Sequence, residues 1–242
     1  MKLFLATLLA IALRFAISEE ISLFNGRDLS GWKQSLGTWS VVGDVSVDAA
    51  SPKAFVVKSG EGVMLNSPAG KTVNITSVAE HGDAQLHVEF NVPKGSNSGI
   101  YVQGRYEIQV LDSYGQQTVG EHDCGAIYQR WDPARGKGNE GYEEHAPKVN
   151  ACKAPGQWQT FDITYRAPRF DASGNKTANA KFVKVVHNEQ VIHENVEMNG
   201  PTRGSVFATE ADLGPIILQG DHGPVAYRNL KITQLEEQAA SR

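Results

Sequence analysis

Three polar side chains at alternate positions are the first feature of this sequence that could do chemistry. Arg105, Glu107 and Gln109 alternate with apolar residues within the segment 97–115, NSGIYVQGRYEIQVLDSYG. Because a β-strand points successive side chains to opposite faces, these three share one face and the apolar residues share the other. A solvated sheet face could carry polar residues without any function. A cation, a carboxylate and an amide in one line instead favour a ligand groove.

Glu107 is the first candidate for proton transfer, as a base or as a carboxylate that positions a ligand. A neighbouring Arg105 would lower the pKa of Glu107 and make it a weaker base, so positioning is the favoured role. As a surface ion pair the two residues would contribute under about 1 kcal/mol and have no functional meaning. Asp112 follows Glu107 at an odd separation, which puts it on the opposite face unless a bulge intervenes. It is either a ligand-binding residue or a turn residue.

His222 is the second candidate for proton transfer. It lies in the Gly-rich turn QGDHGPV, directly after Asp221. A histidine titrates near neutral pH, and a neighbouring carboxylate could orient its ring. The alternative is an exposed loop histidine without a function.

The elements that must position these residues read as strands joined by turns, with no strong helix. Apolar and polar residues alternate at 86–90, 100–103 and 161–166, and Gly, Pro or Asn turns separate such segments. Residues 182–192 are typical of a hairpin. Further strands are expected at 216–218 and 225–232. About a dozen short strands predict an all-β protein, a jelly-roll β-sandwich with a single domain.

The composition and the first residues set the context. The chain has 242 residues, 40% hydrophobic content and a net charge of -4, without a Lys/Arg cluster, which argues against nucleic acid and anionic membranes as partners. Lys2, the apolar run 3–13 and small residues before Glu19 predict a signal peptide at 1–18. The run is too short to span a bilayer comfortably, so no stable span is expected after cleavage, with an uncleaved anchor as the alternative. We expect a domain at 19–235, a polar tail at 236–242, and a secreted or periplasmic location.

Two cysteines, Cys124 and Cys152, are the only ones in the chain. An oxidising compartment favours a disulfide between them, with two free buried thiols as the alternative. The bridge would close a loop of roughly 30 residues, worth about 3 kcal/mol. Trp131 and Tyr142, inside that loop, could stack on a sugar ring or pack the loop against the sandwich. The segment also supplies other polar candidates, namely Glu121, His122, Asp123, Glu143, Glu144 and His145.

Metal binding stays open at this point. The seven histidines show no HxH or HExxH spacing, and Glu121-His122-Asp123 alone is a weak signal. A divalent cation held by carboxylates and carbonyls leaves little trace in a sequence. No cofactor is certain, and a divalent metal is possible.

Six segments in order resemble one family, the 3-keto-disaccharide hydrolases, also described as 3-keto-glucoside 1,2-lyases and 3-keto-2-hydroxyglucal hydratases. The segments are LFNGRDLSGW (23–32), SGIYVQGRYEIQVLDSYG (98–115), CGAIY (124–128), APGQWQTFDITYRAPR (154–169), HNEQVIHENVEMNGPT (187–202) and GPIILQGDHGPVAYRNLKI (214–232). The resemblance covers nearly all of the mature chain. It implies a concanavalin A-like sandwich, which agrees with the strand pattern.

The resemblance also implies the chemistry. A ketone at the third carbon of a glucoside acidifies the neighbouring C2 proton, a base removes it, and the aglycone leaves from C1. Water then adds to the resulting glycal, so the net reaction is hydrolysis and needs no redox cofactor. The site needs a base, an acid and a group that stabilises enolate charge. On this hypothesis Glu107 and His222 carry the proton chemistry.

The remaining candidates would bind the keto sugar, and each has a plainer alternative. Arg228 could hold sugar hydroxyls or the enolate oxygen, or it could pair within the last strand. The substrate-binding set is then Arg105, Gln109, Asp112, Trp131 and Arg228.

Two other functions are kept as alternatives. The first is a non-catalytic carbohydrate-binding module, because this fold often only binds glycans. The second is a retaining glycosidase of the laminarinase type, which needs two carboxyl groups about 5 to 5.5 Å apart. Gln109 stands where such a pair would need an acid, which argues against that mechanism.

Overall fold

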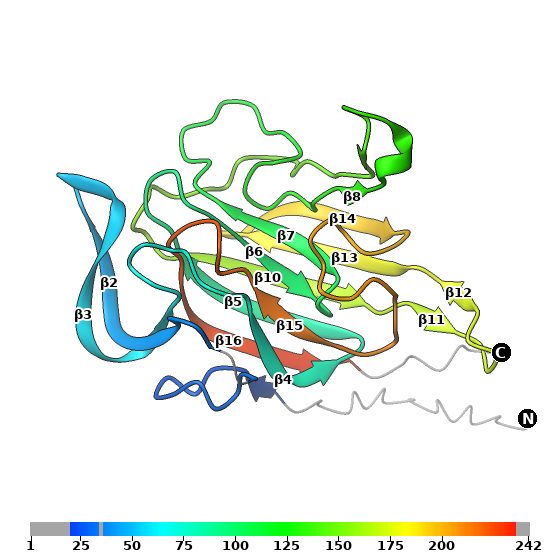
Figure 1. Cartoon of the computed structure of the whole chain (residues 1–242), viewed down its shortest axis with the longest axis horizontal. Coiled ribbons are helices and arrows are strands. Elements are labelled where there is room, and N and C mark those ends of the chain that lie inside the picture. The colour runs from blue at the N-terminus through cyan, green and yellow to red at the C-terminus, as the bar shows by residue number, and fades with distance from the viewer. Residues whose placement is uncertain (1–19, 34–35, 236–242) are drawn as a thin grey trace, which may run out of the picture.

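The computed structural model describes residues 20–33 and 36–235, which form two antiparallel β-sheets packed face to face (Figure 1). This arrangement confirms the predicted all-β sandwich. The predicted signal peptide at 1–18 and the polar tail at 236–242 lie outside the described residues, so both stay predictions. No helix in the described ranges is long and apolar enough to cross a membrane.

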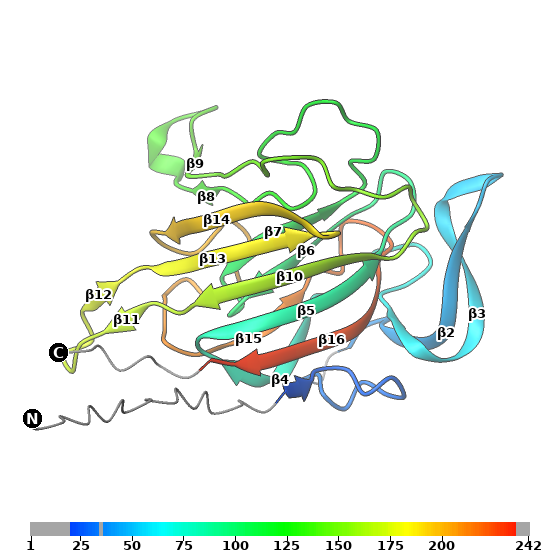
Figure 2. The ribbon, with the colours of Figure 1, turned by 180° about the vertical axis from the view of Figure 1, so that it is seen from behind.

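The larger sheet has the order β14-β13-β10-β5-β16-β3-β2, and β1 pairs with β16 (Figure 2). Its strands are β1 (Glu20–Ser22), β2 (Ser40–Asp48), β3 (Ser51–Leu65), β5 (Ala84–Asn91), β10 (Gln159–Arg166), β13 (Ala180–His187), β14 (Gln190–Met198) and β16 (Ala226–Gln234). The long β2–β3 hairpin extends beyond the rest of the sandwich (Figure 1).

The smaller sheet lies in front of the larger one in Figure 1 and has the order β4-β15-β6-β7. Its strands are β4 (Ile75–His81), β6 (Asn97–Val102), β7 (Tyr106–Leu111) and β15 (Gly214–Leu218). The connecting segments contain two short strand pairs and one short 3-10 helix: β8 (Arg130–Trp131) with β9 (Gly141–Tyr142), β11 (Arg169–Phe170) with β12 (Lys176–Ala178), and η1 (Pro133–Arg135).

The core lies between the sheets and is built by the alternation that the sequence predicts. Tyr106, Ile108 and Val110 of β7 are fully buried in it. From the larger sheet, Phe90 and Phe161 stack with ring centroids 4.9 Å apart. Each buried aromatic or branched side chain of this kind contributes about 1.5–3 kcal/mol through the apolar surface it removes from water.

Two tight turns fix the registers that matter for the site. Asn188 and Glu189 take φ values of 46° and 70° between β13 and β14, as a two-residue hairpin turn requires, and they confirm the predicted hairpin. Gln103 and Gly104, with φ of 51° and 64°, turn the chain between β6 and β7. The side chain of Gln103 locks this turn, because its amide donates to the carbonyls of His81 and Asp212.

Candidate active site

A polar pocket lies on the outer face of the smaller sheet, on the side of β6 and β7 that does not face the core. Tyr101 is the cross-strand neighbour of Glu107, and Gly99 is the neighbour of Gln109. The carboxyl group of Glu107 lies over Gly99, where a Cβ atom would come within 2.1 Å of Oε1. Only glycine leaves room for the carboxyl group in this position.

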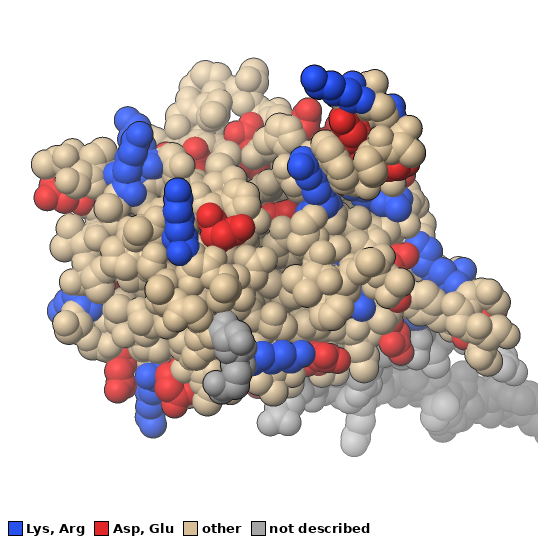
Figure 3. Space-filling model, viewed as in Figure 1, with Lys and Arg blue, Asp and Glu red and all other residues tan. Residues whose placement is uncertain are grey.

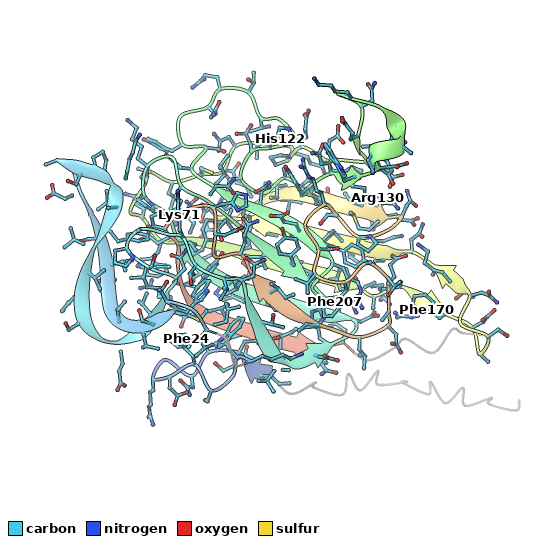
Figure 4. The ribbon with its side chains drawn as sticks, viewed as in Figure 1. Phe24, Lys71, His122, Arg130, Phe170 and Phe207 are labelled. Carbon is cyan, nitrogen blue, oxygen red and sulfur yellow. The ribbon has the colours of Figure 1, made fainter. Side chains whose placement is uncertain are left out.

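Loops from three parts of the chain complete this pocket, whose volume is about 120 Å³. On this face of the molecule, acidic and basic side chains lie close to one another near and above the centre, and the surface below the centre is mostly uncharged (Figure 3). His122 lies in the loops beyond one end of the smaller sheet, and Phe207 lies toward the other end (Figure 4). The lining residues are Asn97, Tyr101, Glu107, Gln109, Tyr128, Arg203, Gly204, Gln219 and His222.

Backbone hydrogen bonds hold two of these loops against β7. The Tyr128 N–H donates to the Glu107 carbonyl (3.0 Å), so segment 125–128 runs along the free edge of β7. The Glu107 N–H donates to Thr202 Oγ1 (3.0 Å), which anchors the loop that carries Arg203. The side chain of Asn66 donates to the carbonyls of Gly220 and Gly223, and so fixes the turn that carries His222.

Glu107 is the most perturbed acid of the site. Its side chain is only 2% exposed, and burial raises its pKa from 4.5 to about 8 because desolvation disfavours the carboxylate. The Tyr101 hydroxyl donates a hydrogen bond that opposes this shift, and the negative charge of Asp221 adds to it. Glu107 is therefore mostly protonated at neutral pH. The sequence-based expectation of a pKa lowered by Arg105 is wrong.

His222, the second candidate for proton transfer, is paired with Asp221. The Nδ1 atom of His222 lies 2.6 Å from Asp221 Oδ1, and the two side chains are 51% and 58% exposed. In the tautomer that donates its Nδ1 hydrogen to the Asp221 carboxylate, the lone pair of the ring is on Nε2. A buried acid and an exposed, oriented base therefore line one pocket.

Amide groups and one guanidinium group supply the remaining polar chemistry. The Oδ1 atom of Asn97 and the Oε1 atom of Gln109 are buried and have no hydrogen-bond partner within the described residues. Such unpaired atoms are costly unless a ligand uses them. Arg203 is the only Lys or Arg among the lining residues, and its guanidinium group lies 3.7 Å from the ring centroid of Trp131.

Arg105 lies outside the pocket, although it was predicted to bind substrate. Its guanidinium group donates to the carbonyls of Thr209 (2.7 Å) and Gln103 (2.8 Å) and lies over the ring of Phe207. Arg105 precedes β7 and belongs to the turn. The alternation of side chains along β7, which directs Glu107 into the pocket, therefore does not extend to Arg105. Its side chain holds the segment around Phe207 against the β6–β7 turn.

Two other predicted substrate ligands also lie elsewhere. Asp112 follows the end of β7 and accepts hydrogen bonds from the backbone N–H groups of Gly95 (2.8 Å) and Tyr114 (3.3 Å), so it is a turn residue. Arg228 lies on β16 in the larger sheet, where it donates to Glu89 Oε2 (2.7 Å) and stacks on Trp158. Asp112 therefore matches the plainer alternative of a turn residue, whereas Arg228 pairs with the neighbouring strand β5 and not within the last strand.

Of the candidate residues in the loop, some lie near the rim of the pocket and the others pack within the loop. Trp131 is 40% exposed and reaches the pocket only through its contact with Arg203. The ring of Tyr142 contacts the guanidinium groups of Arg130 and Arg135, and the ring of His122 contacts that of Tyr128. The others serve the loop: Asp123 accepts from Ser113 and Gly120, Glu143 pairs with Arg130, and the backbone of His145 pairs with Ile127.

The predicted disulfide is not formed, because Cys124 and Cys152 are both free thiols. Their sulfur atoms belong to a group with a ring nitrogen of His187, in which all ligand atoms lie within 4.8 Å of one another. Across the described ranges, this is the only such gathering of three His, Cys, Asp or Glu ligand atoms. None of the three lines the pocket, and a divalent metal in the pocket itself stays untested.

Sequence reasoning missed six lining residues. Asn97 and Tyr101 could have been found, because they alternate with the buried residues of β6 on the side that Glu107 shares across the strand pair. Tyr128, Arg203, Gly204 and Gln219 come from irregular segments without periodicity, so no local pattern indicates them.

Larger hollows lie elsewhere on the surface. One of about 510 Å³ is bordered by β11 and β12 and lined mainly by basic and small polar residues, and one of about 320 Å³ lies on the outer face of the larger sheet. We place the site in the smaller pocket because it alone combines Glu107 with the His222–Asp221 pair.

Comparisons with known proteins agree with this fold. A family model described as the 3-keto-alpha-glucoside-1,2-lyase-like domain matches residues 19–233. No curated protein matches the sequence. A solved structure from Parabacteroides distasonis ATCC 8503, described as a candidate glycosyl hydrolase, is 29% identical with a TM-score of 0.62, over 89% of this chain and 84% of its own.

A second structure from the same organism, with the same description, shares the fold. It is 21% identical with a TM-score of 0.54, over 90% of this chain and 100% of its own.

Proposed function

The chain belongs to the 3-keto-alpha-glucoside-1,2-lyase-like family, and from this premise we propose that it cleaves 3-keto-glucosides by elimination and then hydrates the product. The observation that carries the proposal is a buried Glu107, whose pKa is raised by that burial, in the same pocket as His222, which Asp221 contacts. The reaction needs one group that removes a proton and one that supplies a proton, and this pocket offers both.

In the elimination step, the Nε2 atom of His222 removes the proton from C2 of the sugar, which the neighbouring ketone has acidified. The C1–O bond breaks, and Glu107 donates its proton to the leaving oxygen. The aglycone departs as an alcohol, and the sugar becomes an unsaturated 2-hydroxy-3-keto-glycal. Asp221 stabilises the imidazolium that forms, while the developing charge on the ketone oxygen needs a donor.

In the hydration step, the same two groups work in the opposite direction. The Glu107 carboxylate, whose high pKa makes it a strong base for a carboxylate, takes a proton from water as the oxygen adds to C1. The His222 imidazolium returns its proton to C2. Both groups regain their starting protonation states, and the net products are 3-keto-glucose and the alcohol.

Arg203, Asn97 and Gln109 would hold the sugar in place. Arg203 is the one guanidinium group in the lining, so it is our candidate for the donor to the ketone or enolate oxygen. The unpartnered oxygens of Asn97 and Gln109 can each accept a hydrogen bond from a sugar hydroxyl. The pocket of about 120 Å³ suits part of a single sugar unit, with the aglycone outside. We also propose that the mature chain is exported after removal of the signal peptide.

The test is turnover of keto sugars in heavy water by the mature chain. We expect 3-keto-trehalose or 3-keto-cellobiose to release 3-keto-glucose with deuterium at C2, and the unoxidised disaccharides to stay intact. EDTA-treated protein runs in parallel and reports whether a divalent metal takes part. Saturable binding without turnover of any keto sugar would sink the proposal and leave a carbohydrate-binding module.

Matched variants separate the pocket from the fold. Glu107→Gln and His222→Ala should each lower kcat by at least about 100-fold, the usual contribution of a proton-transfer group. His87→Ala is the control for His222, because His87 and Asp162 form the same pair at 2.6 Å on the outer face of the larger sheet. Glu89→Gln is the control for Glu107. Equal losses in the pocket variants and their controls would refute the assignment.

A further inference from the structure

A second chemical group lies inside the sandwich and has no part in the proposed reaction. Cys124 follows β7, Cys152 precedes β10, and His187 ends β13, which is the neighbour of β10 in the larger sheet (Figure 2). One ligand atom from each lies within 4.8 Å of the other two. Cys124 and His187 are buried, and Cys152 is partly exposed.

The hydrogen bonds around His187 fix its tautomer. The Oε1 atom of Gln159 accepts from the backbone N–H of Lys153 (3.0 Å) and from the side-chain amide of Asn188 (3.1 Å), so this atom is the acceptor oxygen. The Nε2 atom of His187 lies 3.0 Å from the same oxygen and must therefore carry a hydrogen. The Nδ1 atom is left with a lone pair, and this buried atom has no partner in the described structure.

This is the state in which a histidine binds a metal ion. Metal-ligating histidines usually donate their other ring N–H to an oxygen acceptor, which orients the ring and fixes the ligating nitrogen. A neutral ring with one nitrogen held by Gln159 leaves the other nitrogen ready to ligate.

The two thiols supply the complementary donors. A disulfide would use both sulfur atoms but would leave the Nδ1 lone pair of His187 without a donor. A cation bound by all three residues would engage that lone pair together with both sulfur atoms, of which Cys152 Sγ lies 4.0 Å from the Leu111 carbonyl oxygen.

We propose that Cys124, Cys152 and His187 form a buried binding site for one thiophilic divalent cation, with zinc as the best fit. Zinc prefers thiolate and imidazole ligands at about 2.3 Å and 2.0–2.1 Å, so its ligand atoms need to approach to within about 4 Å of one another. Binding releases the two thiol protons, and the two thiolates then balance the charge of the cation. Water can reach the fourth position beside the partly exposed Cys152.

The site would join three segments that the two sheets alone do not tie together. Cys124 and Cys152 lie at opposite ends of the long loop that covers one end of the sandwich, and His187 belongs to the larger sheet. A cation at this point would pin both ends of the loop to β13. The loop contains Tyr128, which lines the pocket, so the metal would support the pocket from outside it.

The experiment is cobalt titration of the full chain, kept reduced with a phosphine under anaerobic conditions. Co²⁺ replaces zinc in such sites and gives thiolate charge-transfer absorption in the near ultraviolet. We expect this absorption to saturate at one equivalent and to disappear when zinc is added. Native mass spectrometry should show one metal gained and two protons lost, which reads the site without any variant.

Variants then assign the ligands. Cys124→Ser and Cys152→Ser should each lose the charge-transfer absorption, and His187→Gln should lose the visible bands of four-coordinate cobalt. His81→Gln is the matched control, because His81 is another buried, neutral histidine on β4, and it should leave all bands unchanged. A reduced chain with two titratable thiols that binds no cobalt, or whose spectrum survives all three ligand substitutions, overturns the proposal.

Discussion

Replacing Glu107 by glutamine should remove one specific pH dependence from the stability of the protein. Glu107 has a pKa of about 8 in the folded state against 4.5 for an exposed glutamate, and burial is the main cause. Below pH 4.5 both states hold the proton, and the stabilisation is fully present. As the pH rises from 4.5 toward 8, the unfolded chain releases the proton while the folded chain keeps it, so the free energy of unfolding falls. Above pH 8 this loss stops.

The size of the effect follows from the two pKa values. Each pH unit between them costs the wild type about 1.4 kcal/mol, so the loss from pH 4 to pH 7 is about 3 kcal/mol. The glutamine side chain of the Glu107→Gln variant resembles the protonated acid in shape and does not titrate. The variant should therefore match the wild type near pH 4 and be about 3 kcal/mol more stable at pH 7.

Chemical denaturation at half-unit steps from pH 4 to pH 9 measures this difference, because subtracting the two curves cancels every other titrating group. The control is Glu89→Gln, which should act in the opposite direction. Although burial raises the pKa of Glu89, hydrogen bonds from Asn229 and Arg228 outweigh it and lower that pKa, so its charge stabilises the fold above the unfolded pKa. If the free energy of unfolding had the same pH dependence in the wild type and in Glu107→Gln, the raised pKa of Glu107 would be refuted, and so would its role as a proton donor.

Three further substitutions test the geometry. Gly99→Ala places a Cβ atom 2.1 Å from Glu107 Oε1 and should lower kcat at least about 100-fold, measured beside an unchanged circular dichroism spectrum. Arg105→Ala should lower stability by about 1–3 kcal/mol in thermal unfolding and leave KM unchanged, because Arg105 serves backbone carbonyls outside the pocket. Arg203→Lys should lower kcat more than it changes KM, because an ammonium group lacks the planar guanidinium that stacks on Trp131. A change in KM without a change in kcat would contradict the role of Arg203 at the enolate oxygen.

The strands could be predicted because the pattern of polar and apolar residues within each segment indicates a strand. The alternation of Glu107 and Gln109 with Ile108 and Val110 is set by the geometry of a single strand, and burial of one face is enough to reveal it. The turn at Asn188-Glu189 is equally local. Such features depend on residues that are close in the sequence, so no knowledge of the sheet order is needed.

Some of the predicted substrate ligands lie outside the candidate pocket because they pair with residues that are distant in the sequence. Arg228 was a plausible sugar ligand until its neighbour across the sheet, Glu89, was known, and that pair joins β16 to β5. Arg105 was placed beside Glu107 by extending a strand alternation one residue too far into the turn. Arg203 gave no signal at all, because a loop without periodicity carries it into the pocket.

Burial of the polar face of β7 is what separates this site from an ordinary sheet surface. On a solvated face Glu107 would ionise near its ordinary pKa of 4.5 and pair with a cation. It would then have no proton to donate at neutral pH. Here segment 125–128 and the loop with Arg203 cover the strand, and within the described ranges no cation lies close enough to the carboxyl group to hold its charge. Desolvation of Glu107 both lowers the free energy of unfolding at neutral pH and keeps a proton available for a leaving group. A variant that regains the lost stability, such as Glu107→Gln, should therefore lose the proton donor.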